Sequence, residues 1–194
     1  GFGRGAPTLV AGSTWPPDEV VLLEAFARVR AHRPEARLIL VPHEPTVDHL
    51  AALDGRIARA GLPLPPRLSI AEGPSPLLVV DRVGVLATLY GAGTMAYVGG
   101  GFGRAGLHSV LEPAAWGVPV AFGPNWRNSR DAELLLRGGA AEELGRGTGN
   151  RGDGVALAEM WEQWIADESH RMAQGARARA IVSEGLGAAR RSAE

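Results

Sequence analysis

A strand, a glycine-rich loop and a short helix follow one another in Tyr97-Val-Gly-Gly-Gly-Phe-Gly-Arg-Ala-Gly-Leu-His-Ser-Val-Leu-Glu-Pro-Ala-Ala-Trp-Gly-Val-Pro119. We expect the helix to open near His108 and Ser109. Glycines let backbone N–H groups approach a phosphate without Cβ obstruction, and the N-terminus of the following helix attracts the same anion. The segment therefore predicts one βα unit of an α/β protein, with an anion-binding loop at the carboxyl end of its strand.

Short apolar runs and helical periodicities alternate along the rest of the chain, which is typical of βα units around a mostly parallel sheet. We expect about six strands, at residues 8–11, 37–41, 68–71, 77–80, 95–98 and 118–122. We expect helices on both faces, at residues 17–31, 47–60, 85–90, 110–116, 130–137, 155–165 and 170–184. The prolines at 63–66 and the glycines at 145–154 indicate loops. The prediction is a Rossmann-like α/β domain over residues 8–184, with a linker remnant at 1–7 and a tail at 185–194.

The composition excludes several kinds of function. The 194 residues carry a formal net charge of −1 and no basic stripe, which argues against a nucleic-acid partner. Cysteine is absent and the five histidines show no zinc-ligand spacing, so neither a disulfide nor a zinc site is expected. No apolar run approaches the ~20 residues that span a bilayer, and residues 1–8 lack the apolar region of a signal peptide. We therefore expect a soluble, cytoplasmic chain.

Glu112 is a candidate ribose-binding residue close to the glycine-rich loop in the sequence. It falls one turn into the predicted helix, where its carboxylate can accept two hydrogen bonds from a ribose diol while phosphate oxygens meet the helix N-terminus. The spacing differs from a GxGxxG loop with an acid about 20 residues later, so a nicotinamide dinucleotide is disfavoured. The alternative is a loop that only turns tightly, with Glu112 as an exposed helix residue.

Two other strand ends carry weaker signals. Ser13 and Thr14 follow the first strand and precede a helix, so each can cap that helix or place a hydroxyl on a phosphate; taken alone, capping is favoured. His43 follows the second strand, where it can donate a hydrogen bond to a phosphate or base, or be a loop histidine without a ligand. Only their combination at one edge of the sheet would make a site.

These pieces resemble one family when they are taken in order. The segments are Ala11-Gly-Ser-Thr14, Val41-Pro-His-Glu44, Val79-Val-Asp81, Gly84 through Leu89-Tyr90, Tyr97-Val-Gly-Gly-Gly-Phe-Gly103, His108, Leu111-Glu-Pro113 and Phe122-Gly-Pro-Asn125. They resemble the C-terminal half of the 3-deoxy-D-manno-octulosonic acid (Kdo) transferases, and the resemblance covers the chain from Pro7 to about Glu184. Several spaced motifs in one order are more specific than any single glycine-rich loop.

The resemblance implies the C-terminal half of a GT-B glycosyltransferase, in which two Rossmann-like domains face each other across a cleft. The family transfers Kdo from CMP-Kdo to the lipid A precursor at the cytoplasmic face of the bacterial inner membrane, with inversion and with neither a metal nor another cofactor. Its general base and its acceptor and membrane contacts belong to the N-terminal domain. We therefore expect this chain to bind the nucleotide sugar and to be inactive in transfer on its own, with no catalytic residue among its 194.

The resemblance also implies roles for individual residues. Ser13 and Thr14 would lie by the phosphate or Kdo, His43 would contact the phosphate or cytosine, and Glu112 would bind the ribose. The residues around the phosphate would be Gly99, Gly100, Gly101, Gly103, His108 and Ser109. Asp81, Val83 and Gly84 would line the base side, and Asn125 is a further donor-binding candidate.

Two departures from the family pattern leave alternatives open. Many members carry Arg-His after the second strand and His-Asn-Pro before Leu-Glu-Pro, whereas this chain has His43-Glu44 and His108-Ser109-Val110. The first form occurs in some branches of the family, but serine reaches less far than asparagine and offers one donor instead of two. The alternatives are a GT-B domain for a UDP-sugar, or a binding module that has lost its donor. Four tryptophans, Trp15, Trp126, Trp161 and Trp164, either fill the core or, if exposed, mark the contact with a missing domain.

Overall fold

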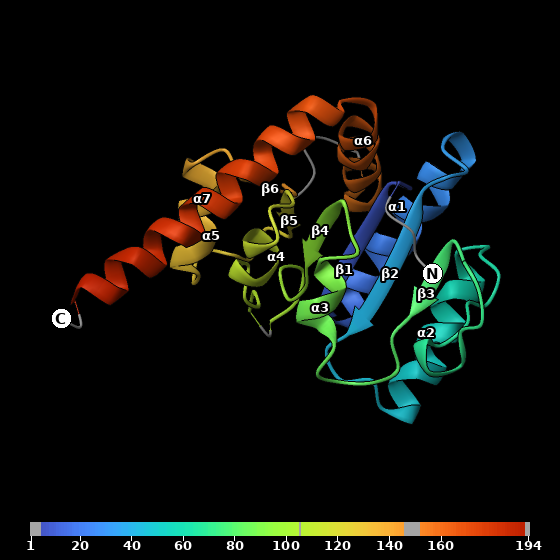
Figure 1. The fold of residues 1–194 in the computed structure, drawn as a ribbon. Coiled ribbons are helices and arrows are strands. Elements are labelled where there is room, and N and C mark those ends of the chain that lie inside the picture. The colour runs from blue at the N-terminus through green and yellow to red at the C-terminus, as the bar shows by residue number, and fades with distance from the viewer. Residues whose placement is uncertain (1–4, 105, 146–151, 193–194) are drawn as a thin grey trace.

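The computed structural model describes residues 5–104, 106–145 and 152–192, and its centre is a six-stranded sheet (Figure 1). The strand order is β3-β2-β1-β4-β5-β6, and every neighbouring pair is parallel. The strands are β1 (Thr8–Thr14), β2 (Arg37–Pro42), β3 (Leu77–Val79), β4 (Met95–Val98), β5 (Val120–Phe122) and β6 (Ala141–Glu143). The chain starts in the middle, builds outward to β3, and then crosses to β4 on the other side of β1. This order confirms the predicted Rossmann-like class and places its switch point between β1 and β4.

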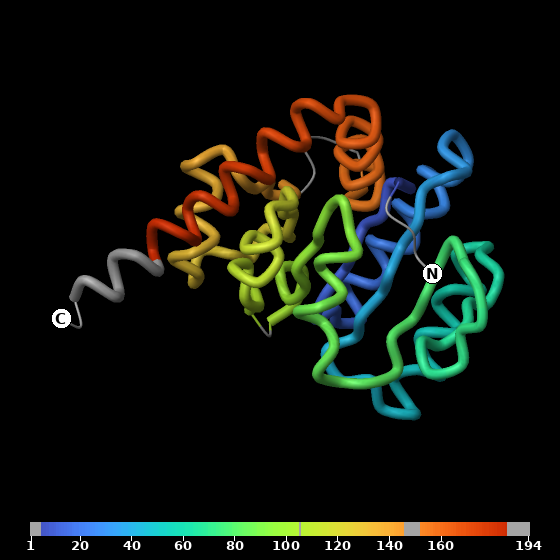
Figure 2. Tube along the Cα trace, viewed as in Figure 1, coloured from blue at the N-terminus to red at the C-terminus, as the bar shows by residue number. Residues whose placement is uncertain are grey.

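Helices cover both faces of the sheet, as predicted. One face carries α1 (Pro16–His32), α2 (Val47–Arg59) and α6 (Asp153–Ala166). The other carries α3 (Leu86–Tyr90), α4 (Leu111–Ala115), α5 (Arg130–Arg137) and α7 (Glu168–Ser192). Figure 2 shows α7 running from α6 along the side of the molecule that α4 and α5 form. Alternation along β1 serves both layers, because Leu9 packs toward α1 and Val10 packs toward α3.

Two of the four tryptophans belong to the core beneath α1 and α6. Trp161 and Trp164 are fully buried, and Trp161 stacks on Phe26 with ring centroids 5.7 Å apart. The indole N–H of Trp164 donates to Gln174 Oε1 on α7 at 2.8 Å and to Glu142 Oε1 on β6 at 3.1 Å. These two hydrogen bonds join α6 to α7 and to β6. The core alternative is confirmed for these two residues. Trp126 is half-buried against Phe122.

The prediction of a strand at residues 68–71 was wrong. A 3-10 turn, Leu68–Ile70, is found there. Leu68 and Ala71 pack against the core, whereas Ile70 is 71% exposed. Asp81 Oδ1 accepts the backbone N–H of Ser69 at 3.1 Å and thereby takes the place of a ladder hydrogen bond. The sixth strand is β6 instead, whose sequence Ala-Glu-Glu gives no apolar signal.

Three boundaries also differ from expectation. α4 opens at Leu111 with Val110 as its N-cap, which is later than predicted. Neither Ser13 nor Thr14 caps α1, because Trp15 is the N-cap residue and β1 extends through Thr14. α7 continues to Ser192, past the predicted start of the tail at 185. Residues 1–4 and 146–151 lie outside the described residues, so the linker remnant and much of the predicted 145–154 loop stay predictions.

Candidate functional site

The glycine-rich loop lies against the end of β1, at the switch point of the sheet. The N–H of Gly99 donates to the carbonyl oxygen of Gly12 at 2.9 Å, which extends the β1–β4 pairing by one residue. A Cβ on Gly99 would overlap the carbonyl oxygen of Ser13 and stand 2.7 Å from Thr14 Cα. Gly100 has φ +95° and sits directly against the backbone of Gly106. Glycine is therefore required at the first two positions for the loop to close on β1.

A buried carboxylate that sequence reasoning missed joins this loop to α1. Asp18 is fully buried, and its Oδ2 accepts the backbone N–H groups of Trp15 at 2.9 Å and Gly100 at 3.0 Å. Its Oδ1 accepts the hydroxyl of Tyr97 at 2.7 Å, and burial together with Asp18 raises the pKa of that phenol. A signal existed, because Asp18 occupies the third helical position after Trp15, where an acidic side chain reaches back to the N-cap.

Three aromatic side chains lie together beside the glycine-rich loop, and we call them the ring cluster: Trp15, His43 and His108. The rings of His43 and His108 stack with centroids 4.2 Å apart, and the ring of Trp15 lies 4.9 Å from that of His43. The backbone fixes both histidines, because His43 N–H donates to Thr14 O at 3.0 Å and His108 N–H donates to Gly99 O at 3.2 Å. The structure therefore brings together two histidines that the sequence placed in separate loops.

Ser13 and Thr14 directly precede Trp15 of the ring cluster, and Thr14 O accepts the N–H of His43. Ser13 has φ +52°, a left-handed conformation that is uncommon outside glycine and typical of functional turns. The hydroxyl of Thr14 is buried without a hydrogen-bond partner in the described part of the chain. A buried polar atom that lacks a partner is unfavourable unless a ligand or water completes it. Both residues thus have the geometry expected of a binding turn.

Glu112 lies in the first turn of α4 with its side chain exposed. Burial raises the pKa of the Tyr90 phenol, and the negative charge of Glu112 raises it further. Tyr90 is buried, and its hydroxyl lies directly against Gly12 in β1. Glu112 therefore flanks the same switch point as the glycine-rich loop. Ser109, two residues before α4, is also exposed.

Asn125 supports the loop from the neighbouring strand end. Its backbone N–H donates to Gly101 O at 2.9 Å and its amide Nδ2 donates to Gly103 O at 3.1 Å. These bonds hold the glycine-rich loop against the segment that follows β5. The geometry gives Asn125 a part in shaping the loop, and its predicted contact with a donor stays a prediction.

Two of the three residues predicted for the base side, Asp81 and Val83, line a shallow hollow together with His43, and Gly84 does not. The hollow has a volume of about 460 Å³, and its lining includes Asp81 and Val83. Val83 is 76% exposed, and Gly84 has φ +83°. Burial raises the pKa of Asp81, but the hydrogen bonds from Ser69, together with the charge of Arg82, hold that pKa below its usual value. Asp81 is therefore an ionised carboxylate engaged mainly in holding the 3-10 turn.

Sequence comparison connects this geometry to known proteins. No family model matches the chain. The 3-deoxy-D-manno-octulosonic acid transferase of Bordetella pertussis is 31% identical over 196 residues, which cover 97% of this chain and 44% of that protein. The transferase of the same name from Aquifex aeolicus is 33% identical over 138 residues, or 70% of this chain and 37% of that protein. The chain is a homologue of the Kdo transferases. It spans less than half the length of these two relatives.

Solved structures place the fold of this Kdo transferase homologue among GT-B domains. The C-terminal CMP-Kdo binding domain of WaaA from Acinetobacter baumannii superposes with a TM-score of 0.78 at 21% identity, covering 92% of this chain and 90% of that one. HepE from Anabaena, solved in complex with UDP, gives a TM-score of 0.60 at 21% identity, covering 91% of this chain and 44% of that one. Both likenesses show the fold.

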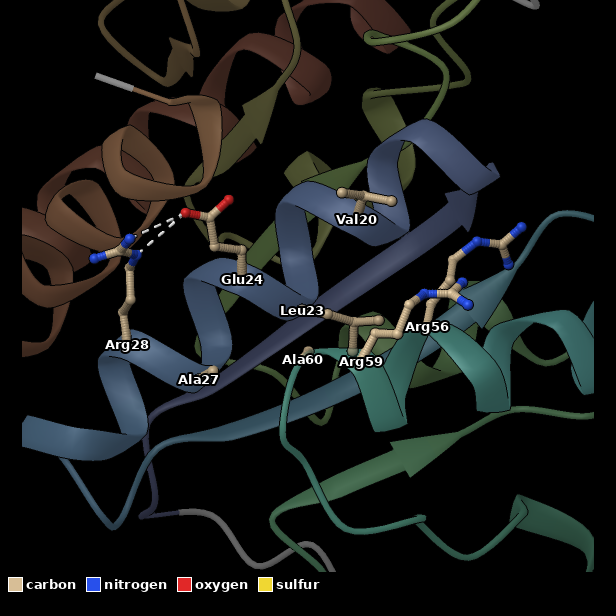
Figure 3. A pocket seen from close by; sticks show the side chains of 8 residues that line it. All are labelled: Val20, Leu23, Glu24, Ala27, Arg28, Arg56, Arg59 and Ala60. Carbon is tan, nitrogen blue, oxygen red and sulfur yellow. Dashed lines mark hydrogen bonds and ion pairs between the residues drawn. The ribbon is translucent and has the colours of Figure 1, made fainter. Parts of the chain in front are cut away.

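The Kdo transferase homologue also has a cavity that is remote from the switch point. It has a volume of about 570 Å³ and lies between α1 and α2, where Val20, Leu23, Ala27 and Ala60 meet the side chains of Arg56 and Arg59 (Figure 3). None of the predicted donor-binding residues lines it. Within the described ranges, no group of three or more His, Asp or Glu side chains is placed to hold a metal ion, and no helix is long and apolar enough to cross a bilayer.

Proposed function

We propose that this Kdo transferase homologue is the CMP-Kdo-binding domain of a GT-B glycosyltransferase. The observation that carries the proposal is the meeting of the glycine-rich loop, the ring cluster and Glu112 at the switch point between β1 and β4. Open parallel sheets bind their ligands at this place, outside the carboxyl ends of the strands. Homology to the Kdo transferases supports the choice of a nucleotide sugar with a cytidine base.

The proposed roles follow from the chemistry of each group. The N–H groups of the first turn of α4 donate hydrogen bonds to the phosphate, together with loop N–H groups other than those of Gly99 and Gly100, which already bond Gly12 and Asp18. His108 donates a further hydrogen bond to it. Glu112 accepts hydrogen bonds from the two ribose hydroxyls. As Kdo leaves, negative charge grows on the phosphate, and the donors already aimed at it stabilise that charge without reorganisation. The site is proposed to work without a metal or other cofactor.

The acceptor side belongs to the complete enzyme. We propose that the whole protein transfers Kdo to the lipid A precursor in lipopolysaccharide biosynthesis, with inversion, at the cytoplasmic face of the inner membrane. An inverting transfer needs a general base on the acceptor hydroxyl. We propose that this base, the acceptor site and the membrane contact lie outside the present chain, because the chain spans 44% of the Bordetella relative.

Thermal unfolding with nucleotides tests donor binding directly. We would measure the midpoint of this chain with millimolar CMP, CTP, UMP and UDP, and of the Glu112→Gln variant under the same conditions. A ligand at 100 times its Kd stabilises the native state by ~2.7 kcal/mol, which is a shift of ~5 °C or more for a domain of this size. We expect a shift with cytidine nucleotides that Glu112→Gln loses. Glu35→Gln, an exposed carboxylate in the turn before β2 and so at the opposite edge of the sheet, should keep it.

The other outcomes decide between functions. Cytosine carries an N4–H donor where uracil carries an acceptor, so a site built for one base leaves the other with unpaired polar groups. A preference for UMP and UDP would therefore reassign the chain to a UDP-sugar transferase. The absence of a shift with all four nucleotides, in this chain and in the full-length protein, would instead indicate a module that has lost its donor.

A further inference from the structure

The contact between Trp15 and His108 determines where the histidine carries its proton. Trp15 Nε1 lies 3.0 Å from His108 Nε2, and the two residues stand 93 positions apart in the chain. An indole N–H only donates, so His108 Nε2 must be the acceptor and must hold a lone pair. An imidazolium has protons on both nitrogens and accepts nothing. The contact therefore requires a neutral His108 with its proton on Nδ1.

The surroundings of the ring favour the same neutral form. Burial lowers the pKa of His108 from its usual value near 6.5, and the stacked ring of His43 from the β2–α2 loop lowers it further. Asp18 from α1 acts in the opposite direction, but its carboxylate already accepts three hydrogen bonds. Because folding holds the ring neutral, the stability that His108 contributes is present above pH 6.5 and is lost as the pH falls.

We infer that Trp15 is a positioning residue that locks His108 in its neutral Nδ1–H form, so that His108 offers a fixed, uncharged hydrogen-bond donor to the phosphate of the donor. No described residue hydrogen-bonds Nδ1, while the backbone N–H of His108 is fixed to Gly99 O at the start of the glycine-rich loop. The phosphate part of this inference rests on the proposed function, whereas the tautomer does not. A neutral donor binds the phosphate equally across the pH range in which an unconstrained histidine would titrate.

The first test reads the ring itself. Long-range ¹H–¹⁵N NMR of this chain between pH 5 and 8 reports the tautomer and the pKa of His108, and a His108→Gln spectrum assigns the signals. We expect an Nδ1–H ring in the parent chain. Trp15→Phe keeps an aromatic ring but removes the N–H, so the Nε2–H form should appear and the pKa should rise. Trp116→Phe is the matched control, because Trp116 also loses an indole N–H bond, to Ala87 O on α3, away from His108.

The NMR experiment overturns the inference in two ways. One is an Nε2–H ring in the parent chain, which needs no variant and holds even if Trp15→Phe fails to fold. The other is a folded Trp15→Phe whose His108 keeps the parent tautomer and pKa, which would make the contact a packing feature without a positioning role.

The second test reads the phosphate. The probe is the methyl phosphodiester of CMP, because its single charge does not change between pH 5.5 and 7.5. We expect the parent chain to bind it with little pH dependence and Trp15→Phe to bind it roughly three- to tenfold more tightly at pH 5.5 than at 7.5, because a charged donor bonds phosphate more strongly than a neutral one. Equal pH profiles in the two proteins would overturn the phosphate role. The absence of binding in both, and in the full-length protein, would defeat the proposed function and with it the phosphate role, while the NMR result would still decide the role of Trp15.

Discussion

Asp18 shows how one buried side chain holds the candidate site together. Its carboxylate bonds the N–H of Trp15, the N–H of Gly100 and the hydroxyl of Tyr97, so it fixes the start of α1 and the glycine-rich loop in one arrangement. All three partners are donors, and a carboxylate accepts from all of them. An amide at the same place has one accepting oxygen and no charge, so the three charge-assisted bonds are lost and the Tyr97 hydroxyl can at best accept from the amide NH2 group.

We therefore expect Asp18→Asn to damage both stability and binding. The lost charge-assisted bonds should lower the free energy of unfolding by about 1–3 kcal/mol, measured by urea denaturation. Affinity for CMP should fall as well, because Gly100 and Trp15 are no longer held. Asp48→Asn, at an exposed position in the first turn of α2, is the control and should leave both quantities unchanged. An Asp18→Asn protein with parent stability would contradict this account.

Single residues also show which features of the site the sequence did not predict. Ser13 and His43 were recognised as candidates because hydroxyls and histidines at strand ends are suited to phosphate, and His108 was recognised from the family resemblance. Their mutual contacts depend on the order of strands, which brings Trp15 against His108 from 93 positions away. Asp18 was missed because an acidic residue in the first turn of a helix is ordinary. Only its full burial beside Gly100 distinguishes it.

At the scale of elements, the glycine-rich loop is defined by how closely it approaches β1. A Cβ on Gly99 would overlap Ser13 O and crowd Thr14 Cα, which are backbone atoms that cannot rotate away. We expect Gly99→Ala to push the loop off β1, to destabilise the chain by about 1–3 kcal/mol and to abolish nucleotide-induced stabilisation in thermal unfolding. Gly73→Ala is the matched control, because a Cβ there meets no atom within 4 Å. Retained binding in Gly99→Ala would refute the close approach.

The elements also show which parts of the fold are readable in the sequence. Interior strands such as β1 and β4 are buried and appear as apolar runs. The bounds of β4 were therefore predicted correctly, whereas β1 was predicted from its first residue but continues to Thr14. Edge positions are different. Residues 68–71 alternate like a strand but form a 3-10 turn that Asp81 holds, whereas Ala-Glu-Glu pairs with β5 because Trp164 and Gln174 bond the Glu142 carboxylate. Whether such an edge segment forms a strand depends on tertiary contacts, which the local sequence pattern does not predict.

Across the whole molecule, the six parallel strands place their carboxyl ends, with the segments that follow them, at one end of the sheet. The predicted donor-binding residues lie at that end of the sheet. Ser13 and Thr14 are the last residues of β1, and the others lie in the segments that come after β2, β3, β4 and β5. The cavity between α1 and α2 lies elsewhere and includes none of the predicted donor-binding residues (Figure 3). The predicted donor-binding residues are therefore gathered at one end of the sheet, which agrees with the proposed function.

An assay of sugar transfer tests whether the general base lies outside this chain, as we propose. We expect this chain, supplied with CMP-Kdo and the lipid A precursor, to form no Kdo-bearing lipid. Its hydrogen-bond donors would stabilise the leaving phosphate, but they do not remove the proton of the acceptor hydroxyl. The Bordetella pertussis relative, of which this chain spans 44%, is the positive control in the same assay. Product would be followed by mass spectrometry of extracted lipid. Transfer by the chain alone, at a rate that Glu112→Gln reduces, would show that the base lies among these 194 residues and would overturn the proposal that it lies outside them.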